Sequence, residues 1–264
     1  MTTTTSLRHV TSKDGTSIAY GRLGDGPPVV LVCGGSVDRH ANAGLAAELA
    51  TDFCVFNYDR RGRGDSSDTL PYAVEREVED IDAVITAAGG TAHLYGASSG
   101  AGLALVAAAS GSAVTRLALW EPPYIVDPAA RPPADTAEVY ERLVAEGRRG
   151  DAVEYFMARV VGMPAEFVAF ARSQPFWAAT EKIAHTLAYD ARVMGDYSVP
   201  LDLAATVTAP TIILTGGASF PFMRQSAAAL AAALQDGRTQ DLQGQEHNVD
   251  PAVLGPALRA FLQA

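Results

Sequence analysis

The sequence has few cysteines, and this shortage excludes a small domain held together by disulfides. Cys33 and Cys54 are the two cysteines among 264 residues. Both lie in apolar, strand-like stretches, which favours two small buried side chains in a reducing compartment over a disulfide. No two cysteines or histidines share the spacing of metal ligands, and no nucleotide-binding loop occurs, so we expect neither a metal nor another cofactor.

Positive charge is also scarce. Twenty Lys and Arg residues stand against 30 Asp and Glu residues, which gives a formal net charge of −10 and a sequence pI of about 4.9. Such a chain offers no basic surface for a nucleic-acid backbone or for anionic lipids. We therefore expect no nucleic acid and no membrane as a partner. We expect a small-molecule substrate, and a protein that is a monomer or a homodimer.

Long apolar runs are absent too. The N-terminal stretch MTTTTSLRHVTSKDG has neither a basic start nor an apolar centre, so it predicts a short disordered lead and not a secretory signal. The longest apolar stretch, residues 101–109, is too short to cross a bilayer, and its alanines suit a buried helix. These features predict a soluble, cytoplasmic protein.

Strand-like and helical segments alternate along the first half of the chain. The composition, with 48% hydrophobic and 19% charged residues, fits one large α/β domain with an insertion. The segment 72–88 has apolar residues at helical spacing and acids on its other face, as in an amphipathic helix. Strands are expected at 16–24, after a hairpin turn, and at 27–35, 53–59, 91–96 and 114–120, with a further helix at 42–50.

The alternation stops after Glu121-Pro122-Pro123, and only helical patterns follow for about eighty residues. We interpret residues 127–205 as an inserted helical cap, with residues 1–126 and 206–264 as the α/β core. Repeated strand and helix units predict a mainly parallel sheet covered on both faces. The expected helices of the insertion are 136–146, 151–161, 165–172 and 180–193, and the core resumes with strands at 209–217 and 238–244 and helices at 222–234 and 251–262.

The stretch Gly96-Ala97-Ser98-Ser99-Gly100 fits the G-x-S-x-G elbow. In that motif small neighbours allow a strained turn that lifts a serine hydroxyl clear of the sheet. The alternative is a small-residue turn between a strand and a helix, without chemistry. Ser98 is the candidate nucleophile if its partners are present.

Four motifs together resemble the α/β-hydrolase superfamily. They are, in chain order, VCGGS, YDRRGRGDS, GASSG and GQEHNV. The resemblance implies an α/β-hydrolase fold, with a mainly parallel eight-stranded sheet flanked by helices and an inserted helical cap. It also implies the chain order nucleophile, acid, histidine.

A serine nucleophile needs a base, and His247 is the candidate. It follows the last expected strand, in the loop Gly244-Gln245-Glu246-His247. A histidine in this position takes the serine proton and later returns it. The alternative is an ordinary surface histidine. Of the other four histidines, His93 lies inside the strand before the elbow and His185 in an expected helix of the insertion. The remaining two, His9 and His40, lie in early segments without matching context.

The acid of the triad is not where the family usually has it. An aspartate usually follows the strand that here reads TIILTGG, but the next residues are Ala218-Ser219-Phe220-Pro221. Haloalkane dehalogenases in this superfamily place the acid one strand earlier, where this chain has Glu121. Glu121 is therefore the candidate acid. The alternative is a structural carboxylate paired with an arginine of DRRGR, and Glu246 and Asp250 are weaker rivals for the catalytic role.

The resemblance assigns the oxyanion hole to the backbone amides of Gly35 and Ser99. Cys33 replaces the histidine that often precedes the glycine, and nothing near it in the sequence favours a reactive thiolate. A serine at the elbow argues against the carboxylate-ester chemistry of dehalogenases and epoxide hydrolases. Candidate pocket residues, with ordinary core packing as the alternative for most, are Ser36, Phe156, Trp177, Phe220 and Met223.

The loop DRRGRGDSS contains three arginines within four residues, which raises the question of an anion site. We interpret it as a structural turn whose charge Asp59, Asp65 and Asp68 neutralise. The sequence thus predicts a cofactor-independent serine hydrolase that cleaves an ester, lactone or thioester of a moderately apolar small molecule through an acyl-enzyme. Two alternatives remain: a cyclase or lyase of the same fold that uses His247 as a base, and a catalytically silent small-molecule binder.

Overall fold

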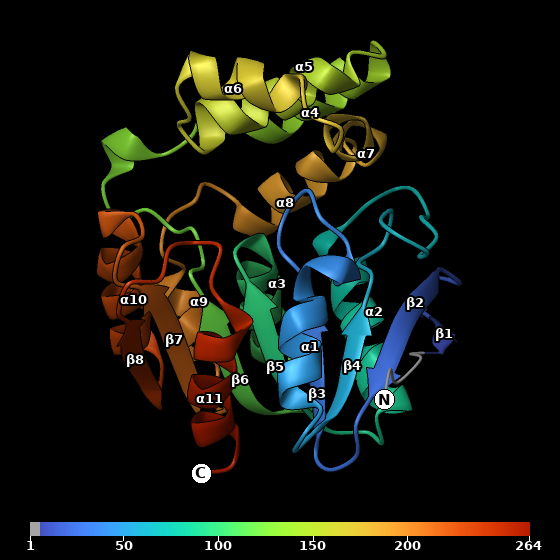
Figure 1. The fold of residues 1–264 in the computed structure, drawn as a ribbon, viewed down its shortest axis with the longest axis vertical. Helices are drawn as coiled ribbons and strands as arrows, with labels where there is room; N and C mark the ends of the chain where they lie inside the picture. Colours follow the sequence, from blue (N-terminus) through green and yellow to red (C-terminus); the bar gives the residue numbers. More distant parts are fainter. Residues whose placement is uncertain (1–5) are drawn as a thin grey trace.

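A computed structural model describes residues 6–264, and within them the strands form one sheet. The strand order is β1-β2-β4-β3-β5-β6-β7-β8 (Figure 1). β1 and β2 run antiparallel to their neighbours, and the remaining pairs are parallel. The strands are β1 (Leu7–Thr11), β2 (Ser17–Leu23), β3 (Pro28–Val32), β4 (Cys54–Tyr58), β5 (Ala92–Ala97), β6 (Val114–Trp120), β7 (Thr211–Gly216) and β8 (Gly237–Leu242).

Helices cover both faces of this sheet. On one face lie α1 (Ala43–Leu49), preceded by the short turn η1 (Arg39–Asn42), and α11 (Pro251–Leu262). On the other face lie α2 (Val74–Ala87), α3 (Ser99–Ala109) and α10 (Pro221–Ala233). This arrangement confirms the predicted fold class, a mainly parallel eight-stranded sheet flanked by helices.

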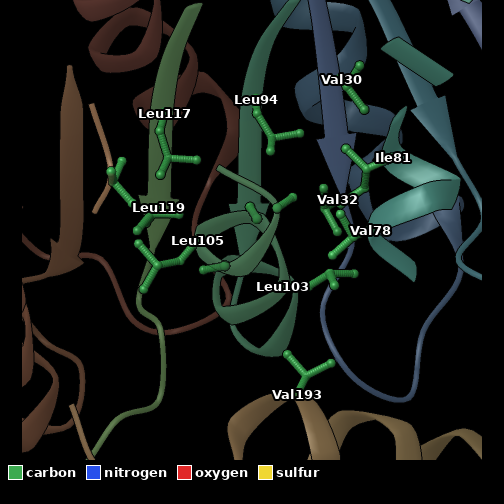
Figure 2. Packing of buried hydrophobic residues seen from close by; sticks show 14 of the residues in the cluster. Val30, Val32, Val78, Ile81, Leu94, Leu103, Leu105, Leu117, Leu119 and Val193 are labelled. Carbon is green, nitrogen blue, oxygen red and sulfur yellow. The ribbon is translucent and has the colours of Figure 1, made fainter. Parts of the chain in front are cut away.

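The apolar runs of the central strands supply both cores. In β3, Val30 and Val32 face α2 and α3 (Figure 2). Val29 and Leu31 belong to the other core cluster, with α1 and α11. Successive strand side chains point to opposite faces, so a strand covered on both faces is apolar throughout. Burial of each such side chain stabilises the fold by about 1.5–3 kcal/mol. The carboxyl ends of β5 and β6 are therefore held rigidly, and two of the candidate catalytic residues, Ser98 and Glu121, follow them.

The segment between β6 and β7 is helical, and much of it has a hydrophobic core of its own. Side chains of α4, α5, α7 and α8 form this cluster, which includes Tyr140, Leu143 and Trp177. Figure 1 shows α4 to α7 above one end of the sheet. The helices are η2 (Pro128–Ala130), α4 (Thr136–Ala145), α5 (Arg149–Tyr155), η3 (Phe156–Val160), α6 (Ala165–Arg172), α7 (Trp177–Lys182), α8 (Thr186–Met194) and α9 (Leu201–Ala205).

Helices α8 and α9 also contact the main domain. Val193 and Met194 at the end of α8 and Ala204 in α9 belong to the main core cluster together with α3. α8 is thus shared between the proposed cap, residues 127–205, and the sheet domain. The single helix expected at 180–193 is wrong, because the chain turns at 183–185 and divides it into α7 and α8.

The expected disordered lead is wrong in part. Residues 7–11 form β1, which pairs with β2 to complete the hairpin. Residues 1–5 lie outside the described part of the chain. None of the helices in residues 6–264 has the length and apolarity needed to cross a membrane.

Candidate active site

Ser98 lies in the sharp turn between β5 and α3. Its backbone has a positive φ of 55°, and its amide donates a hydrogen bond to Trp120 O at 2.8 Å. A side chain on Gly96 would overlap the carbonyl oxygen of Gly100, and a side chain on Gly100 would overlap that of Cys33. The two glycines of the G-x-S-x-G stretch are therefore required by close backbone contacts. The turn is strained in the way expected of an elbow.

Glu121 follows β6, and its carboxylate is completely buried. Glu121 Oε1 accepts a hydrogen bond from Gly216 N at 2.8 Å, and Oε2 accepts one from Ser219 Oγ at 2.9 Å. Glu121 Oε2 also lies 2.6 Å from His247 Nδ1. The carboxylate faces the histidine and not an arginine of the DRRGR loop.

His247 lies in the loop between β8 and α11, and its side chain is 39% exposed. Trp120 Nε1 donates a 2.9 Å hydrogen bond to the carbonyl oxygen of His247, which fixes the backbone there. A proton on Nδ1, shared with Glu121, leaves Nε2 as the ring atom that can accept a proton.

Ser98 and His247 line the same cavity. Within residues 6–264, no hydrogen bond joins the Ser98 hydroxyl to the His247 ring. Such bonds are often long in free enzymes and shorten when substrate binds. The remaining described histidines lie outside the lining of this cavity, and His93, for example, is 2.8 Å from Thr115 Oγ1.

The amides of Gly35 and Ser99 both belong to residues that line the cavity. In the described part of the chain, neither amide donates to another protein atom. Ser99 is the first residue of α3, where amides lack helical partners and the helix dipole favours negative charge. Two free donors beside Ser98 are what a developing oxyanion requires.

Beneath these donors lies a buried group of charges. Arg60 and Arg63, from the loop after β4, both contact Asp190 of α8, at 2.7 and 2.8 Å. Arg60 also pairs with Glu77 of α2 at 2.7 Å. The two arginines are at most 1% exposed. Each has a carboxylate partner, so they form no anion site.

The loop is neutralised, but not by the aspartates that the sequence suggests. Asp59 and Asp65 both pair with Arg39, and Asp68 accepts a hydrogen bond from Tyr189 Oη at 2.8 Å. Arg61 pairs instead with Asp80 of α2, at 2.7 Å. Glu77 and Asp80 are thus buried, although the sequence pattern of α2 predicts them on the solvent face.

The cavity above Ser98 has a volume of about 610 Å³ and a mostly apolar lining. Of the predicted pocket residues, Phe156, Phe220 and Met223 line it. Trp177 does not: it packs in the cap cluster, and its Nε1 donates to Glu181 Oε1 at 2.7 Å. Ser36 does not line it either, and its hydroxyl is buried. Residues that the sequence pattern missed include Trp120, Ile125, Arg159, Met194 and Tyr197.

Cys33 is buried beside the elbow, and burial raises the pKa of its thiol. A neutral thiol is a poor nucleophile. The described residues contain no cluster of three His, Cys, Asp or Glu side chains suited to a metal ion.

Comparison with known proteins matches the chain to one protein family. Residues 29–253 match the model of the alpha/beta hydrolase family. An alpha/beta hydrolase from Sphaerobacter thermophilus DSM 20745 is 51% identical, with a TM-score of 0.90 over 97% of this chain and 100% of that one. A thermophilic esterase from Thermogutta terrifontis, with malate bound, is 23% identical, with a TM-score of 0.74 over 98% of each chain.

A third similar structure is the esterase EaEST from Exiguobacterium antarcticum. It is 19% identical, with a TM-score of 0.74 over 97% of this chain and 99% of that one. Among curated proteins, none matches the sequence significantly. The two esterases share the fold, whereas the Sphaerobacter protein also shares half of the sequence.

Proposed function

The chain belongs to the alpha/beta hydrolase family, and we propose that it is a serine hydrolase that cleaves an ester, lactone or thioester through an acyl-enzyme. In this proposal Ser98 is the nucleophile, His247 the general base and Glu121 the acid that orients the histidine. The amides of Gly35 and Ser99 form the oxyanion hole.

The 2.6 Å contact between Glu121 Oε2 and His247 Nδ1 is the observation that carries the proposal. A buried carboxylate at this ring nitrogen holds the imidazole in one tautomer and stabilises its cation. It leaves Nε2 toward the cavity that Ser98 lines. An ordinary surface histidine has no need of a completely buried carboxylate partner.

The chemical steps follow from this arrangement. Ser98 Oγ attacks the carbonyl carbon while His247 Nε2 takes its proton, and the carbonyl oxygen becomes the oxyanion. The oxyanion accepts hydrogen bonds from the two amides. The leaving alcohol or thiol departs with the proton from His247. Water then attacks the acyl carbon while His247 Nε2 takes its proton, and the acid leaves as the bond to Ser98 Oγ breaks and the proton returns to Oγ.

The apolar lining supports a moderately apolar acyl or alcohol group in the substrate. Phe156 and Ile125 come from the segment between β6 and β7, and Met223 comes from α10. A cavity of about 610 Å³ lies within the range usual for small-molecule sites. The esterases of similar fold are consistent with this substrate class.

Stopped-flow kinetics with a p-nitrophenyl ester tests the acyl-enzyme. We expect a burst of nitrophenol, followed by slower steady turnover, if deacylation limits the rate. Trapping with hydroxylamine detects the acyl-enzyme if acylation limits it. Turnover in the wild type that persists in Ser98→Ala would contradict the acyl-enzyme and favour direct attack by a water molecule that His247 deprotonates. A protein that binds the ester without turnover would be a silent binder.

A further inference from the structure

We propose that Arg63 and Asp190 are positioning residues that aim both backbone donors of the oxyanion hole. Neither side chain reacts with the substrate in this account. Asp190 belongs to helix α8, so the helical insertion takes part in the chemical step and not only in substrate binding. This inference rests on the proposed function.

Arg63 fixes the peptide that carries the Gly35 amide. Its Nη1 donates a hydrogen bond to Gly34 O at 2.6 Å. In a trans peptide the C=O and the following N–H point in opposite directions, so this bond turns the Gly35 N–H away from Arg63. Hydrogen bonding of a carbonyl to a charged donor also polarises the peptide and strengthens its N–H as a donor.

Asp190 holds the residue that carries the second amide. Ser99 Oγ donates a hydrogen bond to Asp190 Oδ1 at 2.8 Å, and Arg60 Nη1 lies 3.3 Å from the same hydroxyl. Ser99 begins α3, so this contact fixes the first turn of the helix next to the elbow. The orientation of the Ser99 amide depends on that turn.

One carboxylate therefore connects the two halves of the oxyanion hole. Arg63 Nη2 donates to Asp190 Oδ1 at 2.8 Å and to Oδ2 at 2.9 Å. Asp190 also lies against the Gly35 backbone: a Cβ at position 35 would be 3.0 Å from Asp190 Oδ2. Loss of the carboxylate frees Arg63 and Ser99 together.

Arg60 and Arg63 also neutralise the charge of Asp190. A bare carboxylate beside the oxyanion hole would repel the negative charge that develops there. Burial alone would raise the pKa of Asp190, but the charges of Arg63 and Arg60 outweigh burial and hold it below its usual value. Asp190 stays ionised and paired, so its field is cancelled near the donors.

The position of α8 is fixed independently of this carboxylate. The Tyr189 ring stacks on Tyr72 with a centroid separation of 3.8 Å, and its hydroxyl donates to Asp68. These contacts on the neighbouring residue hold the helix against the loop after β4. Conservative changes at position 63 or 99 therefore leave the helix in place.

The test compares kcat and KM of three variants with a matched control. Arg63→Lys keeps the charge but loses the forked contact with Gly34 O and Asp190. Ser99→Ala removes one hydroxyl and leaves every buried charge paired. Asp190→Asn removes the central charge. The control is Asp80→Asn, which breaks an equally buried arginine pair of the same loop away from the cavity.

Loss of one oxyanion donor lowers kcat by about 10² to 10³, and a misdirected donor costs less. We expect kcat to fall roughly tenfold to hundredfold in Arg63→Lys and several-fold in Ser99→Ala, with KM within about twofold of the wild type. The control should lower the melting temperature and leave kcat within about twofold. If Asp190→Asn does not fold, the other two variants decide.

The inference is overturned if folded Arg63→Lys and Ser99→Ala keep wild-type kcat, or if Asp80→Asn lowers kcat as much as they do. It is also overturned if only KM rises. A fluorophosphonate separates these outcomes from a failure of the proposed function. A wild type that neither turns over esters nor reacts with the probe contradicts the function itself, whereas equal labelling rates in wild type and variants contradict the inference alone.

Discussion

Glu121 is the acid of the proposed triad. Three groups from later in the chain converge on its carboxylate: Gly216 N, Ser219 Oγ and the His247 ring. Ser219 follows β7, where the resemblance to the superfamily predicts an aspartate, and its hydroxyl donates to Glu121 Oε2 after the neighbouring strand. Both oxygens of this buried carboxylate therefore have a hydrogen-bond partner.

Glu121→Gln is expected to lower kcat by up to roughly ten-thousandfold, because an amide selects the wrong histidine tautomer. Ser219→Ala should lower it far less, since Gly216 N still holds the carboxylate. Steady-state kinetics on a p-nitrophenyl ester measures both, with circular dichroism to confirm folding. A Glu121→Gln enzyme within tenfold of the wild type would mean that Ser98 and His247 act as a dyad.

Ser98→Ala and His247→Ala should each remove nearly all turnover, and the double variant should be no worse than either single one. Members of a nucleophile and base unit act together, so their losses do not add. The measurement is kcat/KM for the three variants on one ester. Additive losses would show that the two residues act in separate steps.

At the scale of the element, the elbow depends on two close approaches. Gly96→Ala and Gly100→Ala each place a methyl group against a backbone carbonyl, which cannot move aside. We expect a melting temperature several degrees below that of Gly90→Ala, where the added methyl group meets open space and only the positive φ is strained. Thermal unfolding of the three variants measures this. Equal losses would mean that the elbow yields easily.

Strands that contain a buried apolar run were predictable from the sequence, as β3, β4, β6 and β7 show. β8 was also predicted, although four of its six residues are exposed. β1 was missed because four of its five residues are exposed and its pattern is polar. The burial of Glu77 and Asp80 was missed because their arginine partners come from a loop, and helical periodicity does not report contacts with a loop.

The buried charges predict a specific acid response. The folded-state pKa of Asp190 is lowered, so its stabilising contribution is complete above the unfolded value near 3.9 and is lost as pH falls through the folded value. Asp190→Asn should be less stable than the wild type by about 3–5 kcal/mol at pH 7, because two buried arginines lose a partner.

That difference should shrink as the pH falls below about 4, since the unfolded wild type then binds a proton at this carboxylate, whereas the folded wild type binds it only at lower pH. Urea unfolding of both proteins from pH 7 to pH 3 measures it. A stability difference that stays constant from pH 7 to pH 3 would contradict this prediction, because it would mean that the charge of Asp190 does not stabilise the folded state.

At the scale of the whole molecule, the cavity is assembled from distant parts of the chain. Trp120 ends β6, Phe156 comes from the insertion and Leu254 comes from α11. The sequence identifies Ser98 and His247 as candidates because each sits in a local motif, and Glu121 because of its place directly after β6. The sequence does not identify the cavity lining in the same way. Trp177 and Met194 are both large apolar residues of helical segments, but Met194 lines the cavity and Trp177 packs among the helices of the insertion.

The apolar lining predicts a dependence on acyl chain length. Burial of each methylene contributes about 0.8 kcal/mol, so kcat/KM for p-nitrophenyl esters should rise up to about fourfold per added methylene until the cavity is full. A series from acetate to decanoate measures this. Highest activity on acetate, with steady loss for longer chains, would contradict an apolar binding site.

The most direct test of the account is to find which atom a serine-reactive probe modifies. The folded protein is treated with a fluorophosphonate, digested and analysed by peptide mass spectrometry. We predict one adduct, on Ser98, that is absent in Ser98→Ala and forms much more slowly in His247→Ala. A folded, ester-hydrolysing wild type with no adduct, or with its adduct on another residue, would contradict Ser98 as the nucleophile.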